Sequence, residues 1–300
     1  MMAQRITSIL PDMTYEEALE ITKIYSVAGY LSKDRPVVAS RPFRAPHHTI
    51  TPVSLIGGGT SPKPGEISLA HYGVLFLDEL PQFNKNMLEL LREPLEDGNI
   101  TINRMNGSLT YPCKFMLVAS MNPCPCGYYG SPEKECTCSE KSILNYIGKI
   151  SGPLLDRIDI QIEVNKVGYE KMQSNQQTET SAEIRKRVNR AREIQTNRYK
   201  ESKIFSNSEM TPKMINQYCT LDEESREMLK IAFERLGLSA RAYSRILKVA
   251  RTIADLDESE QIEKKHVAEA IQYRSLDRKY WKNWKLNKGI FCEGKISKYA

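Results

Sequence analysis

Helical and strand-like spacings of apolar residues alternate along the chain, and the first clear element is a helix. Thr14 and Glu17 have the spacing of a capping box, and Gly29 supplies a C-terminal stop. Apolar residues between them recur at helical spacing. We therefore predict a helix between Thr14 and Gly29, preceded by a shorter helical segment that stops at Pro11. From 35 to 66 the chain is rich in Pro, Gly and His, which predicts irregular loops rather than core.

Apolar runs of strand length follow. Residues 73–78 and 114–122 each predict a buried strand, and residues 84–97 between them predict a helix with a leucine face and a stop at Gly98. Alternating β-branched residues before the turn residues Met-Asn-Gly predict a β-hairpin with Arg104 near its tip.

The pattern then divides the chain into two domains. Residues 158–164, "IDIQIEV", predict a further strand, and strands separated by helices and loops indicate a three-layer α/β domain over residues 1–168. The polar segment 169–181 predicts a linker, and an all-helical domain follows over 182–276. Its helices are predicted at about 180–200, 211–219, 222–236, 239–255 and 263–274. Residues 277–300 read as an irregular basic tail.

Composition narrows the class of protein. The chain has 300 residues, 40% hydrophobic and 27% charged, as expected of a globular protein. Its net charge of +6 permits a polyanionic partner such as nucleic acid. No apolar run reaches the roughly 20 residues of a membrane helix, and no signal peptide is apparent, so we expect a cytoplasmic protein with no membrane partner.

Adjacent carboxylates end the first buried strand. Four apolar residues followed by Asp78 and Glu79 match the Walker B pattern of P-loop NTPases, in which the Asp holds Mg²⁺ and the Glu polarises the attacking water. The carboxyl end of a strand in an α/β sheet opens onto a ligand crevice, which suits such a role. Acids at a strand end are also common as helix caps, so the motif alone does not decide.

Other polar residues stand at comparable positions. Asn122 ends the next strand and would orient a water molecule, or belong to an ordinary turn before Pro123. Arg157 lies between two aspartates and would be either a salt-bridge partner or an arginine finger that reaches a neighbouring subunit's phosphate. Arg241 and Arg245, in the first turns of a predicted helix, include a candidate phosphate sensor.

Long motifs carry a resemblance to a known family. The segments "RPFRAPHHTITPVSLIGGGTSPKPGEISLAHYGVLFLDELPQF", "LLREPLEDGNITINR", "ASMNPCPCG" and "LLDRIDI" resemble the magnesium-chelatase-like AAA+ ATPases of the ComM and YifB type. The resemblance covers the chain to about residue 280. It implies an AAA+ P-loop NTPase core with an all-α lid, ATP and Mg²⁺ as cofactors, a hexameric ring of copies of the chain, and movement of DNA during recombination.

The resemblance also implies a role for each site residue. Asp78 and Glu79 correspond to Walker B, Asn122 to sensor 1, Arg157 to the arginine finger and Arg241 to sensor 2. Two inserts, near 41–70 and 99–112, would face the central pore. Their basic residues are the candidates for contact with DNA, namely Arg41, Arg44, Lys63 and Arg104.

The phosphate-binding loop of the family is missing from the sequence. No G-x-x-x-x-G-K-[ST] occurs, and the family's loop would sit immediately before residue 1, after a Lon-protease-like domain that is absent too. We therefore expect weak nucleotide binding and no hydrolysis by this chain alone. The missing strand would leave the sheet incomplete with two unpaired edges, so the isolated chain is expected to fold poorly until the upstream segment is restored.

Two other functions are compatible with the same motifs. A chelatase-like remodeller would insert Mg²⁺ into a porphyrin or reshape a protein partner. A non-catalytic ring subunit would supply Arg157 to a neighbour's site while its own site stays inactive.

Cysteine and basic clusters add two candidate sites. Four cysteines in one loop suit a structural Zn²⁺ ion or remain free thiols, namely Cys124, Cys126, Cys136 and Cys138. His47 and His48 are adjacent, so their rings are predicted on opposite faces of an extended segment. Residues 180–200 hold seven basic residues and two acidic ones, typical of a solvated helix face or of phosphate contacts on DNA.

Overall fold

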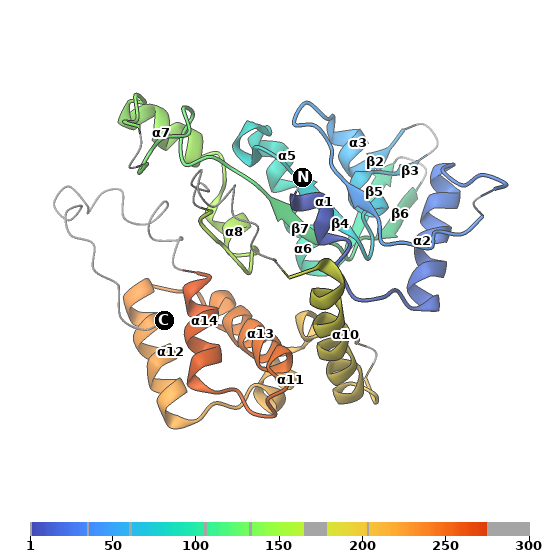
Figure 1. Cartoon of the computed structure of the whole chain (residues 1–300). Coiled ribbons are helices and arrows are strands. Elements are labelled where there is room, and N and C mark those ends of the chain that lie inside the picture. Colours follow the sequence, from blue (N-terminus) through green and yellow to red (C-terminus); the bar gives the residue numbers. More distant parts are fainter. Residues whose placement is uncertain are drawn as a thin grey trace.

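The computed structural model describes residues 2–34, 36–59, 62–104, 107–131, 134–164, 179–202 and 204–274. Figure 1 shows an α/β part that contains the strands and a separate group of helices, α11 to α14, with α10 standing beside the strands. The predicted boundaries between domain, linker and tail remain predictions, because residues 165–178 and 275–300 lie outside the described residues.

The α/β part contains short elements joined by long connections. In chain order they are α1 (Met2–Ile6), α2 (Tyr15–Ala28), β1 (Phe43–Arg44), α3 (Pro52–Ile56), β2 (Gly57–Gly58), β3 (Lys63–Pro64), α4 (Glu66–Leu69), β4 (Val74–Leu77), η1 (Leu80–Gln82), α5 (Lys85–Glu89), α6 (Arg92–Asp97), β5 (Asn99–Arg104), β6 (Gly107–Pro112), β7 (Met116–Ala119), α7 (Glu140–Ile147) and α8 (Gly152–Leu155).

Local signals in the sequence fix α2. Thr14 accepts a hydrogen bond from the Glu17 backbone, and the Glu17 carboxylate accepts one from the Thr14 backbone, which closes the predicted capping box. Gly29 ends the helix at φ +79°, a left-handed conformation that glycine adopts without a Cβ penalty. Both predicted ends of this helix are confirmed.

The central sheet is parallel and, among the described residues, has the order β1-β4-β7. Val74 pairs with Met116 and Leu77 with Ala119. Leu75 and Leu77 are buried in a core with residues of α4, η1, α5 and α8. Met116, on the edge strand β7, is 46% exposed. The fold is therefore a parallel sheet packed with helices, followed by a helical region, as the sequence predicts.

Strand β1 was missed by the sequence pattern. Residues 35–66 were predicted to be irregular, yet Phe43 and Arg44 pair with Val74 and Leu75 of β4. Two residues are too short for a periodic signal, so only the neighbouring strand defines β1. In the same region, Leu55 of α3 is buried in the core.

The helix predicted over 84–97 is divided into α5 and α6. Asn84 caps the first helix through its side chain, and the second ends before Gly98. Pro94 explains the division, because it has no backbone N–H and its ring would clash with the Leu90 carbonyl of a continuous helix. Leu88 and Leu91 nevertheless reach the same core.

The strand predicted over 158–164 is absent, although all of these residues are described. Ile160, Ile162 and Val164 are 51%, 64% and 72% exposed. The backbone N–H of Gln161 instead donates to the carbonyl of Tyr273 in the helical region, at 2.9 Å. A strand requires a neighbouring strand that completes its ladder, and among the described residues no strand pairs with this segment.

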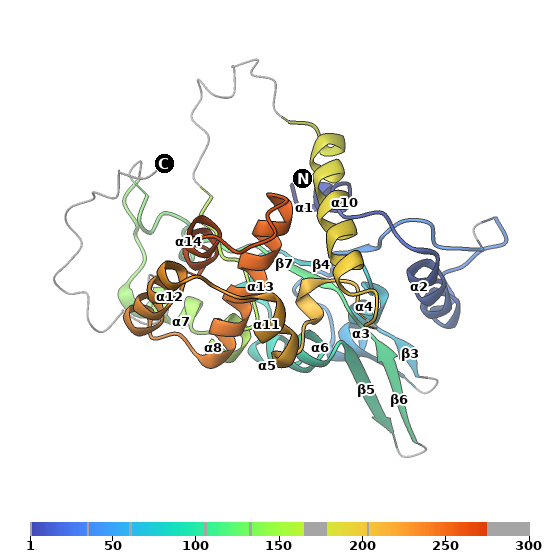
Figure 2. The same ribbon diagram turned by 90° about the horizontal axis from the view of Figure 1, so that it is seen from below.

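The hairpin β5–β6 confirms its prediction. Asn99 pairs with Pro112 and Arg104 with Gly107. Figure 2 shows this hairpin extending away from the rest of the α/β part, with β3 beside it. The Tyr111 hydroxyl donates to the Pro62 carbonyl at 3.0 Å. The two segments predicted as inserts therefore pack against each other.

Five helices predicted in the second half of the chain are confirmed within a few residues. They are α10 (Ser181–Arg198), α11 (Pro212–Tyr218), α12 (Glu223–Leu236), α13 (Ala240–Leu256) and α14 (Lys264–Gln272), with η2 (Asn207–Glu209) between the first two. Apolar residues of α11 to α14 form a second core. α13, whose residues Ile246, Ala250 and Ala254 are buried, lies at its centre.

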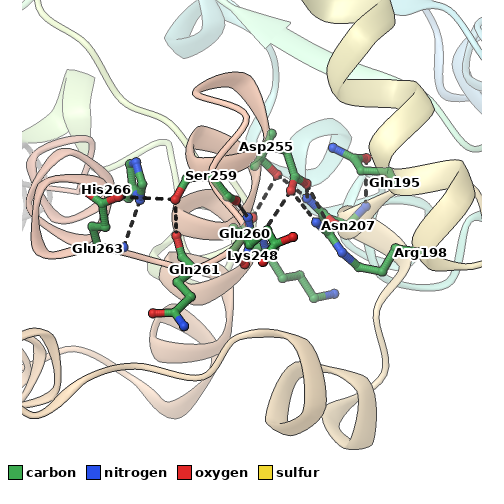
Figure 3. A network of polar contacts seen from close by, with 12 residues as sticks. Gln195, Arg198, Asn207, Lys248, Asp255, Ser259, Glu260, Gln261, Glu263 and His266 are labelled. Carbon is green, nitrogen blue, oxygen red and sulfur yellow. Dashed lines mark hydrogen bonds and ion pairs between the residues drawn. The ribbon is translucent and has the colours of Figure 1, made fainter.

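A buried carboxylate joins α10 to this core (Figure 3). Asp255 is 1% exposed and accepts hydrogen bonds from both terminal nitrogens of Arg198. Asn207 Nδ2 donates to it at 2.8 Å and Arg251 Nε at 3.1 Å. The side chain of Gln195 accepts from the Asn207 backbone. Elements from three parts of the helical region therefore meet at one acid.

Candidate functional site

The acid pair lies on a turn at the carboxyl end of β4. Asp78 and Glu79 are both exposed, whereas Leu77 before them and Leu80 after them are buried. Asp78 Oδ1 accepts hydrogen bonds from the hydroxyl of Ser120 and from the Glu79 backbone. Strand β4 is thus anchored in the core on both sides of the turn while its carboxylates face outward.

Glu79 has a left-handed backbone, with φ +51° and ψ +51°. This conformation costs an L residue about 1 to 2 kcal/mol. Such strain is found where the surrounding structure fixes a functional side chain. Here the turn is held by the Leu80 N–H, which donates to the Ser120 carbonyl at 2.9 Å.

Asn122 follows the neighbouring strand β7 and is exposed. Tyr146 of α7 lies against this segment. Burial raises the pKa of the Tyr146 hydroxyl, a hydrogen bond from the Asn122 backbone opposes the rise, and the charge of Glu79 adds to it. The Asn122 backbone therefore lies next to Tyr146, and the parallel pairing of β4 with β7 places the acids and the amide after the carboxyl ends of adjacent strands.

The two predicted arginines meet at a different place. Arg157 is buried and donates to Glu96 and, at 2.8 Å, to the Pro153 carbonyl. Arg241, at the start of α13, is 3.4 Å from the other oxygen of Glu96. The hydrogen bond from Arg157 is the main cause that lowers the pKa of Glu96. In this structure Arg157 is thus a salt-bridge partner within its own chain, which was one of the two interpretations of the sequence.

Arg245 connects the helical region to the segment after α8. Its terminal nitrogen Nη1 donates to the Arg157 carbonyl at 2.9 Å and to Asp159. Nearby, the Ser239 hydroxyl donates to Asp156 at 3.3 Å. The sequence predicts Arg245 only as an alternative to Arg241 for a phosphate sensor, and nothing in its pattern indicates these partners.

Ser120 and Glu96 were not identified from the sequence. The one signal for Ser120 is its place between the strand residues of β7 and Asn122, and its contact with Asp78 depends on the register of β7 against β4. Glu96 lies in an acidic helix end that has no distinguishing spacing. Both residues acquire a role only through partners that are distant in sequence.

Two predicted DNA-contacting arginines have partners inside the molecule. Arg41 is 11% exposed in its side chain and donates to Glu17 and to the carbonyls of Pro11 and Tyr72. Arg44 makes a two-pronged pair with Glu66 at 2.6 Å. These contacts favour packing roles over DNA contact.

Lys63 is exposed and remains a candidate for DNA contact, whereas the side chain of Arg104 lies outside the described atoms. The basic helix α10 also has mostly internal partners: Arg190 pairs with Glu258, Arg198 with Asp255, and Arg192 donates to the Phe205 carbonyl. Part of this basic face therefore binds within the chain, and phosphate contact by its exposed residues stays a prediction.

The prediction for the adjacent histidines is wrong. The ring centroids of His47 and His48 are 4.0 Å apart, not on opposite faces. The Ile50 N–H donates to the His47 carbonyl at 2.9 Å, so the chain turns at this point and the alternation of an extended segment does not apply. His47 Nδ1 lies 2.9 Å from the Thr49 hydroxyl.

The cysteine loop lies immediately after Asn122. The sulfur atoms of Cys124, Cys126, Cys136 and Cys138 all lie within 4.8 Å of one another, and no disulfide joins them. Backbone N–H groups of Tyr128, above all, and of Thr137 point at the Cys126 sulfur and lower the pKa of this thiol. The sequence prediction of one four-cysteine cluster therefore agrees with the geometry.

The chain combines a parallel sheet, with acids and an amide after the carboxyl ends of adjacent strands, and a helical region whose arginines reach the sheet domain. This is the architecture of an AAA+ core with its lid. The family described as "Magnesium chelatase, subunit ChlI" matches residues 1–172, and its C-terminal counterpart, "Magnesium chelatase, subunit ChlI C-terminal", matches residues 178–274. The chain belongs to this family.

Similar proteins point to one branch of the family. The chain is 46% identical over 280 residues to "Competence protein ComM" of Haemophilus influenzae, and 44% identical over 279 residues to "Uncharacterized protein YifB" of Escherichia coli. Each match covers 93% of this chain but only 53% and 54% of the relatives, so the chain spans about half their length. The branch is the ComM and YifB type.

The helices give no indication of a membrane segment. Within the described ranges, none combines the length and the apolar character that crossing a bilayer requires.

Proposed function

We propose that this chain is the AAA+ module of an ATP-driven motor that moves DNA through a hexameric ring. The observation that supports the proposal is that Asp78, Glu79 and Asn122 are exposed and follow the carboxyl ends of two adjacent parallel strands, β4 and β7. A carboxylate that binds Mg²⁺, a second one that polarises water and an amide that orients it are the groups that phosphoryl transfer needs there.

The donor set at this edge fits Mg²⁺. Mg²⁺ is usually bound by one or two carboxylates together with waters and substrate phosphates. Asp78 Oδ1 is engaged by the Ser120 hydroxyl, which orients the carboxylate and leaves its second oxygen available to a cation. Magnesium would supply charge neutralisation of the phosphates, while Glu79 would accept a proton from the attacking water.

The two arginines proposed to recognise phosphate are paired with a carboxylate in this structure. Arg157 and Arg241 both approach Glu96, so their use on a phosphate requires that the anion replace this carboxylate. We propose that Glu96 holds the two guanidinium groups near each other until a nucleotide is bound. An assembly of subunits would then present Arg157 to a neighbour's site.

The sequence contains no G-x-x-x-x-G-K-[ST] loop, whose backbone N–H groups and lysine would bind the phosphates. We propose that hydrolysis requires a P-loop segment joined ahead of residue 1, as the family resemblance implies. The 300 residues alone should bind nucleotide weakly.

The test compares the 300-residue chain with the same chain extended by such a segment. We expect ATP hydrolysis only in the extended protein, stimulation by branched DNA, and movement of the branch point. Glu79→Gln in the extended protein should reduce the rate by about 10² to 10⁴ while nucleotide binding persists. Hydrolysis that DNA does not stimulate, without branch movement, would contradict the proposal.

A second candidate is favoured by the family match. The description "Magnesium chelatase, subunit ChlI" raises a chelatase-type remodeller of a porphyrin or of a protein partner. The same extended protein distinguishes the two, because a porphyrin would then stimulate hydrolysis and branched DNA would not.

A further inference from the structure

The four-cysteine loop forms a compact group of sulfur atoms beside the Asn122 edge. Cys124 lies 3.3 Å from Cys126 and 3.6 Å from Cys136, and Cys126 lies 3.5 Å from Cys136, measured between sulfur atoms. With Zn–S bonds of about 2.3 Å, a tetrahedral thiolate site separates its sulfurs by about 3.8 Å. The observed spacing is close to that value and far longer than the ~2.05 Å of a disulfide bond.

The backbone builds this arrangement from two short arms. The first arm, Cys124 to Cys126, ends in a turn in which the Gly127 N–H donates to the Cys124 carbonyl at 3.0 Å. Gly127 has φ +81°, a conformation for which glycine is suited. The second arm returns from the far side of the loop and places Cys136 and Cys138 against the first.

Hydrogen bonds to sulfur complete the surroundings. The Tyr129 N–H donates to the Cys124 sulfur at 3.3 Å. Backbone donors to metal-bound thiolates orient the ligands and stabilise their negative charge. Cys124 is fully buried and the other three cysteines are partly buried.

The loop also packs against α7. Ile143, Tyr146 and Ile147 of that helix form a small core with the cysteines, separate from the two main cores. Tyr146 lies in turn against the backbone of Asn122. Four of the residues in this core are buried, so a metal ion held by the cysteines would add much of its stability.

We propose that Cys124, Cys126, Cys136 and Cys138 bind one structural Zn²⁺ ion, which fastens α7 and the segment after Asn122 into a single unit. Four protein ligands leave no open position, so the ion has a structural role and not a catalytic one. Binding releases the protons of those thiols that are not yet ionised, and no oxidation or reduction occurs. The proposal does not depend on ATP hydrolysis or on DNA.

The first experiment measures metal in the purified 300-residue chain by inductively coupled plasma mass spectrometry. We expect about one Zn²⁺ per chain, and loss of most of it in the double variant Cys126→Ser and Cys138→Ser. Cys219→Ala is the matched control, because Cys219 is buried in the helical region and lies outside the cluster. The control should keep its zinc.

A second experiment tests the ligand set without relying on variants that fold poorly. Wild-type chain from which zinc has been removed is loaded with Co²⁺, and the visible absorption of a tetrahedral cobalt thiolate centre is recorded. Such a spectrum, bleached when Zn²⁺ is added, supports the proposal. A flat spectrum, or purified protein that contains iron in place of zinc, would overturn it.

Hydrogen exchange then tests the structural role. Removal of zinc with a chelator should increase exchange in residues 139–148 and in the segment after Asn122, while α12 and α13 stay protected. Wild-type protein with less than about half an equivalent of zinc, four thiols that react freely, and unchanged protection of α7 would show that the cluster is a set of free thiols.

Discussion

Arg157 and Arg241 approach the same carboxylate, that of Glu96, from opposite parts of the chain. Arg157 follows α8 in the α/β part and Arg241 begins α13 in the helical region. A guanidinium group forms its strongest contacts with carboxylates and phosphates, so the same two side chains suit a nucleotide once Glu96 is displaced. At the scale of single residues, the group that an arginine binds therefore decides whether its role is structural or phosphate-binding.

His71 shows the same dependence on partners. Its side chain is 1% exposed, its Nδ1 accepts the Lys114 backbone N–H at 3.0 Å, and its Nε2 lies 3.1 Å from Glu20. The ring is thus neutral and donates through Nε2. Burial, the main cause, lowers its pKa despite Glu20, while Lys114 lowers it further and Glu17 opposes the change.

This pKa shift predicts a pH dependence of stability. Above the unfolded pKa of about 6.5, His71 is neutral in both states and its contribution to stability is complete. As the pH falls toward the lower folded pKa, the unfolded chain binds a proton that the folded ring does not, and this favours unfolding. The free energy of unfolding should fall by at most about 1.4 kcal/mol per pH unit as the pH drops below about 6.5. Urea unfolding at pH 7, 6 and 5 measures this.

The variant His71→Asn is the comparison for that measurement. Its side-chain oxygen can still accept the Lys114 N–H, but it does not titrate. We expect a shallower loss of stability with falling pH than in wild type. Equal slopes for the two proteins would assign the pH dependence to other groups.

At the scale of elements, short-range signals decide where helices begin and end, and long-range contacts decide how they dock. α10 has a capping box at Thr180 and Glu183 that is visible in the sequence. Its attachment to the helical core depends on Arg198, which reaches Asp255 on α13, 57 residues away. A charged helix face is therefore partly a docking surface.

Asp255→Ala should detach α10. The change leaves Arg198 and Arg251 without their shared buried partner, and breaking a buried pair typically costs about 3 to 5 kcal/mol. We expect a lower urea midpoint and faster hydrogen exchange throughout α10. Glu227→Ala, which removes an exposed carboxylate of α12 paired with the exposed Lys230, should cost only about 1 kcal/mol or less. Comparable losses in both variants would show that the buried network is not what holds α10.

At the scale of the whole molecule, the segment 156–161 connects the two parts. Arg245 reaches Arg157 and Asp159, Ser239 reaches Asp156, and the Gln161 backbone donates to Tyr273. The helical region therefore contacts the α/β part next to Arg157. Movement of the lid in an AAA+ cycle would change the position of this arginine directly.

Arg245→Ala should loosen the lid. A hydrogen bond that involves a charged group contributes about 1.5 to 3 kcal/mol, and Arg245 is only 23% exposed. We expect faster hydrogen exchange in residues 156–161 and greater sensitivity to proteases between the two parts. The matched control is Arg235→Ala, an exposed arginine on α12. If Arg245→Ala leaves exchange in 156–161 unchanged, the contact does not hold the lid.

The sequence by itself determined α2, the helices α10 to α14, the hairpin, the order of the two parts and the placement of Asp78, Glu79 and Asn122 after strands of the sheet. These features depend on residues within about one helical turn or on the alternation of side chains along a strand, so a short stretch of sequence is enough to predict them. The family motifs added the class of protein, which the comparisons confirmed.

Only the tertiary structure decided which residues pair. It gave Arg41 and Arg157 partners inside the chain, joined Ser120 to Asp78, and gathered four cysteine sulfurs into one cluster. It also left 158–164 without strand structure, because an apolar, alternating sequence becomes a strand only when another backbone lies beside it. An ion pair or a strand pairing needs a second group that is distant in sequence, and only the folded chain brings that group into contact.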